Sequence, residues 1–193
     1  MGKSAKMNNL MVDIESLGAV PDGVIVQIGA CYFDNEGNIG DRFLVNIDIQ
    51  SSLNLGFKVD KDTLKWWFER SQLITWLSDT VSVHKALRQF REFCYKNKQA
   101  ELWSHDYDKI MLLTAYKQIG EKFPISYKQF RDLRTLVALS KIKVKKPEGD
   151  PKTHNALDDC VYQVGYVCKA LKSLKSVRRT YDVSATQRKS STR

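Results

Sequence analysis

The spacing of apolar and polar positions divides the chain into a strand-rich first part and a largely helical remainder. Apolar runs at residues 9–18, 24–33 and 42–49 predict three strands, and the first has the composition of a central strand covered on both faces. Short turns join the three runs, and parallel neighbours would need longer crossovers. We therefore expect an antiparallel meander.

From residue 61 onward the apolar residues recur at helical steps of three and four. This period predicts helices at residues 63–70, 82–98, 108–119, 133–139 and 156–174. Two short strands are expected at residues 101–104 and 124–127. The order of elements predicts an α/β fold with a mixed five-stranded sheet in a layer flanked by helices.

Size and charge limit the organisation and the partners of the chain. A length of 193 residues suffices for one domain with a full core, and we assign it residues 1–175. Residues 176–193 are expected to form a basic, disordered tail, because they hold few apolar residues. The net charge of +9 favours a polyanionic partner, with nucleic acid first and an acidic membrane surface second. Seven basic residues against one acid lie at 172–193, so the domain itself is only mildly basic.

Other features indicate the cellular compartment. No apolar run approaches the roughly 18 residues that cross a bilayer, and the first residues lack the pattern of a secretory signal. The four cysteines show no close pair with the spacing of a zinc or redox site, so we expect free, buried thiols. An intracellular, cytoplasmic protein is the resulting expectation.

Two carboxylates interrupt the first apolar strand. Asp13 and Glu15 are two residues apart, so they should emerge on one face of the strand about 7 Å from each other. Like charges at that distance repel unless a proton or a cation lies between them, and Mg²⁺ or Mn²⁺ bound by one or two carboxylates would relieve the repulsion. Taken alone, the pair is equally consistent with an exposed strand face.

Two further stretches carry groups suited to chemistry. WSHDYD, at residues 103–108, lies where a predicted strand ends and a helix begins, which is where functional groups of α/β sheets gather. Asp106 and Asp108 could equally be helix caps. HNALDD, at residues 154–159, begins the last helix, and there Asn155 could be a cap and His154 an ordinary surface histidine.

Together the three stretches resemble the DEDDh branch of 3′-5′ exonucleases, which includes RNase T, oligoribonuclease and polymerase proofreading subunits. The family motifs are an acidic pair on the first strand, an aromatic residue followed by Asp, and HxAxxD. Asp13 and Glu15 match the first, Tyr107 and Asp108 the second, and residues 154–159 the third. MVDIESLG, TLKWWF, WSH before YD, and HNALDD are similar to the small phage-type DexA exonucleases and their bacterial relatives.

The resemblance spans residues 9–171 and has one departure. The stretch between His105 and the aromatic residue is one residue shorter than the family pattern. Asp106 therefore stays open as the third carboxylate, although Asp108 directly follows Tyr107 and matches better.

The resemblance implies an RNase H-like fold and a metal-dependent exonuclease that releases nucleoside 5′-monophosphates from single-stranded DNA or RNA. It implies two divalent ions, Mg²⁺ or Mn²⁺, with Asp13 bridging both, Glu15 and Asp159 on the ion that activates water, and Asp108 on the other through waters. His154 would take the proton from the attacking water. A homodimer, and a phage-encoded protein acting in the host cytoplasm, are implied by the resemblance alone.

Substrate contacts are expected from side chains around these motifs. Leu17 would wedge against the terminal base, and Trp66 would stack on it while Trp67 fills the core with Leu64 and Phe68. A purely structural role for both tryptophans is an equal alternative. The complete set of expected substrate contacts is Leu17, Gly18, Trp66, His105, Tyr107, Asn155, Lys145 and Lys146.

Two alternatives to a general exonuclease stay open. One is a catalytically silent nucleic-acid-binding module on the same fold, and the other is an enzyme specialised for dinucleotides. No motif decides between DNA and RNA, because that choice depends on contacts to the 2′ position.

Overall fold

The computed structural model describes residues 6–70, 74–144 and 154–190, and from residue 176 onward only their backbone. Its centre is a mixed six-stranded sheet with the order β4-β3-β2-β1-β5-β6. β1 (Asn9–Ser16), β2 (Ile25–Phe33) and β3 (Ile39–Ile47) form the predicted antiparallel meander. β5 (Glu101–Ser104) pairs parallel to β1, so β1 is a central strand.

Two strands differ from the prediction of a five-stranded sheet. β4 (Thr80–Val81) pairs parallel to β3 and is too short to give a periodic signal. The other edge strand, β6, is Phe130–Asp132 and not residues 124–127. The predicted position was wrong because Ser126 caps the short 3-10 helix η3 (Tyr127–Gln129), and the chain becomes extended only after that turn.

The helices agree with the predicted periodicity, and their ends are set by caps. They are α1 (Ile49–Leu53), α2 (Lys61–Phe68), α3 (Val83–Cys94), α4 (Asp106–Gln118), α5 (Leu133–Ser140) and α6 (Ala156–Ser190), with the 3-10 turn η2 (Tyr95–Asn97) after α3. Ser82 caps α3 as expected, since its side chain accepts from the Lys85 amide. α1 was not predicted. Asp48 caps it and ends β3 two residues earlier than the predicted strand end at residue 49.

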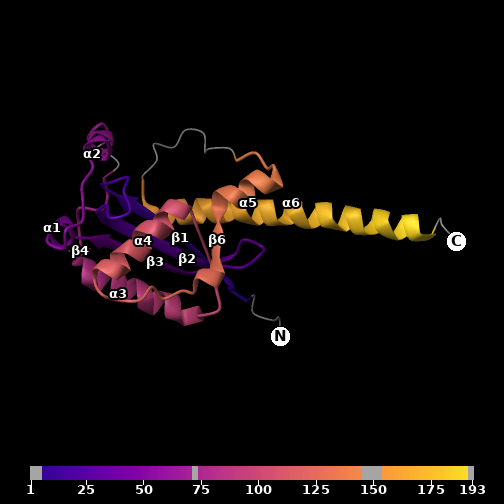
Figure 1. Ribbon diagram of the computed structural model, residues 1–193, viewed down its shortest axis with the longest axis horizontal. Helices are drawn as coiled ribbons and strands as arrows, with labels where there is room; N and C mark the ends of the chain where they lie inside the picture. Colours follow the sequence, from indigo (N-terminus) through magenta and orange to yellow (C-terminus); the bar gives the residue numbers. More distant parts are fainter. Residues whose placement is uncertain (1–5, 71–73, 145–153, 191–193) are drawn as a thin grey trace.

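α6 continues well beyond residue 174, where the sequence analysis ended it, and beyond the start of the tail that it expected to be disordered. Residues 176–190 contain no Gly or Pro, and adding residues to an existing helix is easier than nucleating a new one. Figure 1 shows this helix projecting past the sheet. The separation of residues 176–193 as a basic tail stays a prediction.

Helices cover both faces of the sheet, which confirms the layered α/β arrangement. Side chains alternate along β1, so Leu10 and Val12 pack in one core with residues of α3 and α4. Met11 lies on the opposite face and packs with residues of α5 and α6. Asp13 and Glu15 share the parity of Met11, so the period of the strand directs both carboxylates toward the α6 side.

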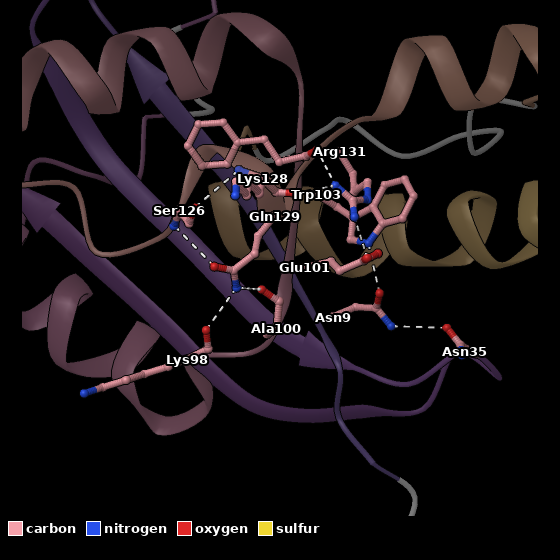
Figure 2. A network of polar contacts seen from close by, with 11 residues as sticks. Asn9, Asn35, Lys98, Ala100, Glu101, Trp103, Ser126, Lys128, Gln129 and Arg131 are labelled. Atoms are coloured by element: carbon pink, nitrogen blue, oxygen red, sulfur yellow. Dashed lines mark hydrogen bonds and ion pairs between the residues drawn. The ribbon is translucent and has the colours of Figure 1, made fainter.

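A polar network stabilises the end of the sheet farthest from these carboxylates (Figure 2). Asn9, at the start of β1, accepts from the Trp103 indole at 3.0 Å and donates to Asn35 at 3.3 Å. Gln129 donates to the Ala100 carbonyl at 2.7 Å, and Arg131 pairs with Glu101 at 2.6 Å. These bonds join β1, β5 and β6 at one end and leave the other end for the carboxylates.

The structure tests the predictions for the cysteines and for membrane-spanning segments. Cys31, Cys94, Cys160 and Cys168 are buried free thiols, which confirms the expectation. Among the described residues, none of the helices combines the length and the apolar character that crossing a membrane demands.

Candidate active site

β1 supplies the first two carboxylates. Asp13 is 8% exposed and Glu15 is 9% exposed, so neither lies on an open strand face. A register shift between Glu15 and Ser16 marks the place where the strand stops pairing regularly with β2. The exposed-face alternative for this pair is therefore wrong.

The start of α6 packs directly on β2, beside Asp13. Gly29 is the β2 partner of Asp13, and a Cβ atom at Gly29 would lie 2.2 Å from the Ala156 carbonyl carbon. The Ala156 amide donates to Gln27 of β2 at 2.8 Å, and the Leu157 amide donates to the Asn155 side chain at 3.0 Å. The absence of a side chain at position 29, together with these two bonds, fixes the first turn of α6 over the sheet.

This docking brings the HxAxxD motif to the carboxylates of β1. Ligating atoms of Glu15, His154 and Asp159 all lie within 4.8 Å of one another. The His154 ring meets the Trp66 ring edge-on, with centroids 4.6 Å apart, and the Trp67 ring at 5.8 Å. His154 is thus part of the site and not an ordinary surface histidine.

α4 contributes the remaining carboxylate, and the structure distinguishes its two candidates. Asp106 is mostly exposed and forms an ion pair with Lys109 at 2.6 Å. Asp108 is turned inward, where burial, and to a smaller extent the charge of Asp159, raises its pKa. Its Oδ2 atom is buried and has no hydrogen-bond partner in the part of the chain that the structure describes. The geometry therefore favours Asp108 over Asp106.

We call the four carboxylates Asp13, Glu15, Asp108 and Asp159 the acidic cluster, and three of them have raised pKa values. Burial and then the charges of Asp108, Glu15 and Asp159 hold the pKa of Asp13 well above its ordinary value. Burial, followed by the charges of Asp159 and Asp108, raises the pKa of Glu15 to about 8. Burial is also the main reason that the pKa of Asp108 rises to about 7. Carboxylates crowded in this way, with one buried oxygen lacking a partner, form an all-oxygen donor set that fits a hard divalent cation.

Two buried glutamines complete the site, and sequence analysis missed both. Gln163 is 5% exposed and donates to Asp13 at 2.7 Å, which lowers the pKa of that carboxyl against the dominant effect of burial. Gln27 links the start of α6 to Asn46 of β3. Gln163 follows Asp159 by four residues on the same helix face, so helical spacing could have identified it. Gln27 has no comparable local signal.

The predicted base-contacting residues divide into buried and accessible ones. Trp67 is 3% exposed and donates to the Ser16 carbonyl at 2.9 Å, which confirms its place in the core. Trp66 is half-buried, with the Arg70 guanidinium carbon 4.5 Å from its ring centroid. Phe68 is 71% exposed, so its expected place in the core was wrong. Leu17 is only 3% exposed, which leaves little of its side chain for the predicted contact with a base.

The other predicted substrate contacts occupy varied positions. Gly18 is buried next to Leu17. His105 precedes α4 and borders a pocket between α5 and α6, and Tyr107 is half-buried against the core. Asn155 caps α6, and this agrees with the prediction that it is a helix cap. Lys145 and Lys146 lie outside the described residues.

Comparisons with known proteins concern the family and the fold of the chain. A family model described as the 3′-5′ exoribonuclease Rv2179c-like domain matches residues 8–171. No curated protein sequence matches the chain. Membership of the phage DexA-type group stays a prediction.

Solved structures share the fold at low sequence identity. E. coli exonuclease I in complex with a 5cy-dA13 oligonucleotide superposes with a TM-score of 0.60 and 16% identity, over 92% of this chain and 42% of that chain. The zinc-bound form of an E. coli exonuclease I–ssDNA complex gives 0.61 and 12%, over 92% and 44% of the two chains. The Mg²⁺- and Mn²⁺-bound form of S. pombe Pop2p gives 0.53 and 14%, over 84% and 82%. The chain spans less than half the length of these exonuclease I chains, and at such identities the likeness shows the fold alone.

Proposed function

Because the chain belongs to the Rv2179c-like 3′-5′ exoribonuclease domain family, we propose that it removes nucleotides from the 3′ end of a single nucleic-acid strand and releases nucleoside 5′-monophosphates. The observation that carries this proposal is the convergence of His154, Glu15 and Asp159 within 4.8 Å, next to Asp13 and Asp108. Three segments far apart in the sequence supply these groups. A purely structural role gives no reason to bring four carboxyl groups together, two of them buried and two half-buried.

The acidic cluster would hold two divalent ions, Mg²⁺ or Mn²⁺. The crowded carboxylates support this, and S. pombe Pop2p, which shares the fold, has a Mg²⁺- and Mn²⁺-bound form. Such ions supply activation of a water at neutral pH and neutralise the charge that develops on phosphate oxygens. Gln163 keeps Asp13 oriented toward the cluster through its 2.7 Å bond.

His154 would accept the proton of the attacking water. An imidazole that titrates near neutrality suits this task, and the ring is within reach of the acidic cluster. The edges of Trp66 and Trp67 restrict the orientation of the ring. Trp66 is also half-buried and in contact with His154, so we assign it to stacking on the 3′-terminal base.

A labelled-strand assay tests the proposal. Single-stranded RNA and DNA carrying a 5′ label, incubated with Mn²⁺, should shorten progressively from the 3′ end, with RNA the first candidate because of the family description. The variant Asp108→Asn should lose at least about a thousandfold in rate, because one of the groups that act on the phosphodiester is gone. Asp106→Asn is the matched control on the same helical turn and should retain activity, since that side chain pairs with Lys109.

The outcomes separate the proposal from its alternatives. Strands that are bound and never shortened would overturn the proposal in favour of a silent binding module. Rapid cleavage of dinucleotides with negligible cleavage of longer strands would overturn the general substrate range in favour of a dinucleotide enzyme. Equal loss of activity in Asp106→Asn and Asp108→Asn would contradict the assignment of the third carboxylate.

A further inference from the structure

A pocket of about 410 Å³ lies between α5 and α6, next to the acidic cluster. His105 borders it at the start of α4, Arg134, Val137 and Ala138 line it from α5, and Tyr162 and Tyr166 line it from α6. We call it the α5–α6 pocket. It shares Tyr162 and Tyr166 with a second hollow of about 420 Å³, which Lys143 and Lys169 border. The two hollows together form an aromatic surface flanked by cations.

The lining of the α5–α6 pocket suits a flat heterocycle with polar edges. Tyr162 and Tyr166 are half-buried, and their ring centroids are 5.7 Å apart. Val137 supplies an apolar wall, which leaves aromatic and aliphatic surface for stacking. His105 borders the pocket, and its buried Nδ1 atom has no hydrogen-bond partner among the described residues, so rotation of the ring would offer this nitrogen to a ligand without breaking a described bond of that atom. Aromatic rings combined with an arginine are the usual means of holding bases without selecting a sequence.

The position of the pocket relates it to the cleavage site. The charges of Asp13 and Asp159 act on Tyr166, and the charge of Arg134 acts on Asp108, so the pocket wall adjoins the acidic cluster. Trp66, which we assign to the terminal base, belongs to α2. In the view of Figure 1, α2 and α5 lie on either side of the start of α6. Trp66 and the α5–α6 pocket thus border the acidic cluster from different elements, Trp66 through its contact with His154 and the pocket through Tyr166 and Arg134.

We propose that the α5–α6 pocket binds a base on the 5′ side of the scissile phosphate. This inference rests on the proposed exonuclease function and adds a second base site to it. The terminal nucleotide lies against Trp66, the scissile phosphate lies at the acidic cluster, and a base of the strand that remains after cleavage lies between Tyr162 and Arg134. Holding both sides of the phosphate fixes its position relative to the carboxylates.

Substrates lacking single bases, combined with a variant that fills the pocket, test this proposal. Ala138→Trp places a large side chain into the pocket from an exposed helix position. Leu139→Trp is the matched control, because that neighbouring residue is 66% exposed and does not line the pocket. Tyr162→Ala removes one stacking ring without filling the space. Each protein is assayed on an intact strand and on strands with one abasic residue, at successive positions before the 3′-terminal nucleotide.

For the natural protein, one abasic position should lower kcat/KM by roughly 5- to 100-fold, the range expected for loss of one stacked base. Ala138→Trp and Tyr162→Ala should show a similar loss on the intact strand, mainly through KM, and no further loss when that base is absent. Leu139→Trp should behave like the natural protein. The proposal is overturned if Ala138→Trp and Leu139→Trp have the same kcat/KM on the intact strand. It is also overturned if each abasic residue lowers kcat/KM equally in the natural protein and in Ala138→Trp.

The same comparison by fluorescence anisotropy in EDTA measures strand binding without cleavage. A natural protein that shortens no strand but shows the abasic effect in binding would contradict the exonuclease proposal and support the pocket. A protein that shortens strands, but whose binding and rates are the same in the pocket variants, would support the exonuclease proposal and overturn the pocket. Failure of the pocket and failure of the enzyme are therefore distinguishable.

Discussion

The contact between Gly29 and the start of α6 gives the sharpest prediction for a residue outside the acidic cluster. In Gly29→Ala the new Cβ atom would lie 2.2 Å from the Ala156 carbonyl carbon and 2.4 Å from the Leu157 amide nitrogen. Both are backbone atoms, so no side chain can rotate away. Ordinary contact begins at 3.4 Å, and the first turn of α6 must therefore move by roughly 1 Å.

That displacement acts on stability and on activity together. Overpacking of this kind costs about 1–3 kcal/mol of unfolding free energy. The moving turn carries Asp159 and follows directly on His154, and a misplacement of about 1 Å lowers rates by about a hundredfold. Gly29→Ala should therefore unfold at lower urea concentration and should also lose about a hundredfold in kcat/KM when fully folded.

Gly165→Ala is the matched control on the same helix. A Cβ atom there meets nothing within 4 Å, so the variant should be as stable as the natural protein or more stable by about 0.5–1 kcal/mol. Urea unfolding of both variants, followed by assays on the folded fraction, makes the comparison. If Gly29→Ala matched Gly165→Ala in stability, or lost stability while keeping full activity, the docking of α6 on Gly29 would not position the site.

Three further predictions concern the acidic cluster. The pKa values of Glu15 and Asp108 rise from ordinary values of 4.5 and 3.8 to about 8 and about 7, so the folded state binds these protons more tightly than the unfolded chain. In EDTA, the stability contributed by these two groups should then be greatest below about pH 4, should fall as the pH rises and should be lost above about pH 8, whereas a melting temperature that rises from pH 5 to pH 8 would contradict the shifts. Asp13→Asn should abolish cleavage yet raise the melting temperature in EDTA above about pH 8, because it removes a buried carboxyl whose ionised form is disfavoured by burial and by its neighbours, and a lower melting temperature would refute that reasoning. Gln163→Leu removes the hydrogen bond that this side chain donates to Asp13, so Mn²⁺ binding measured by calorimetry should weaken by roughly tenfold, and unchanged affinity would exclude a positioning role for this glutamine.

Local sequence was sufficient to predict the elements that carry the catalytic motifs. The period of two along β1 placed Asp13 and Glu15 on one face, and helical spacing located the start of α6 with His154 and Asp159. These elements are long or strongly patterned, so their own residues determine them. The convergence of the three motifs came from the family resemblance, because spacing along a chain gives no distances between its segments.

What the sequence could not predict depends on distant partners. β4 has two residues and exists only through its pairing with β3. The roles of Gln27 and Gly29 follow from the docking of α6, which begins more than a hundred residues later in the chain. Phe68 continues a helical stripe toward the core and still lies exposed, because α2 ends there. Leu17 lies two residues after Glu15 but turns into the core, so its position in the sequence did not reveal its burial.

Crystals soaked with Mn²⁺ and a nucleoside 5′-monophosphate test the central claim most directly. The claim is that Asp13, Glu15, Asp108 and Asp159 converge to hold divalent ions at the phosphate. Anomalous scattering should show manganese between these four carboxylates, with the phosphate beside His154 and the base on the Trp66 side. Manganese bound elsewhere on the protein, or a nucleotide that binds away from the four carboxylates, would contradict the account.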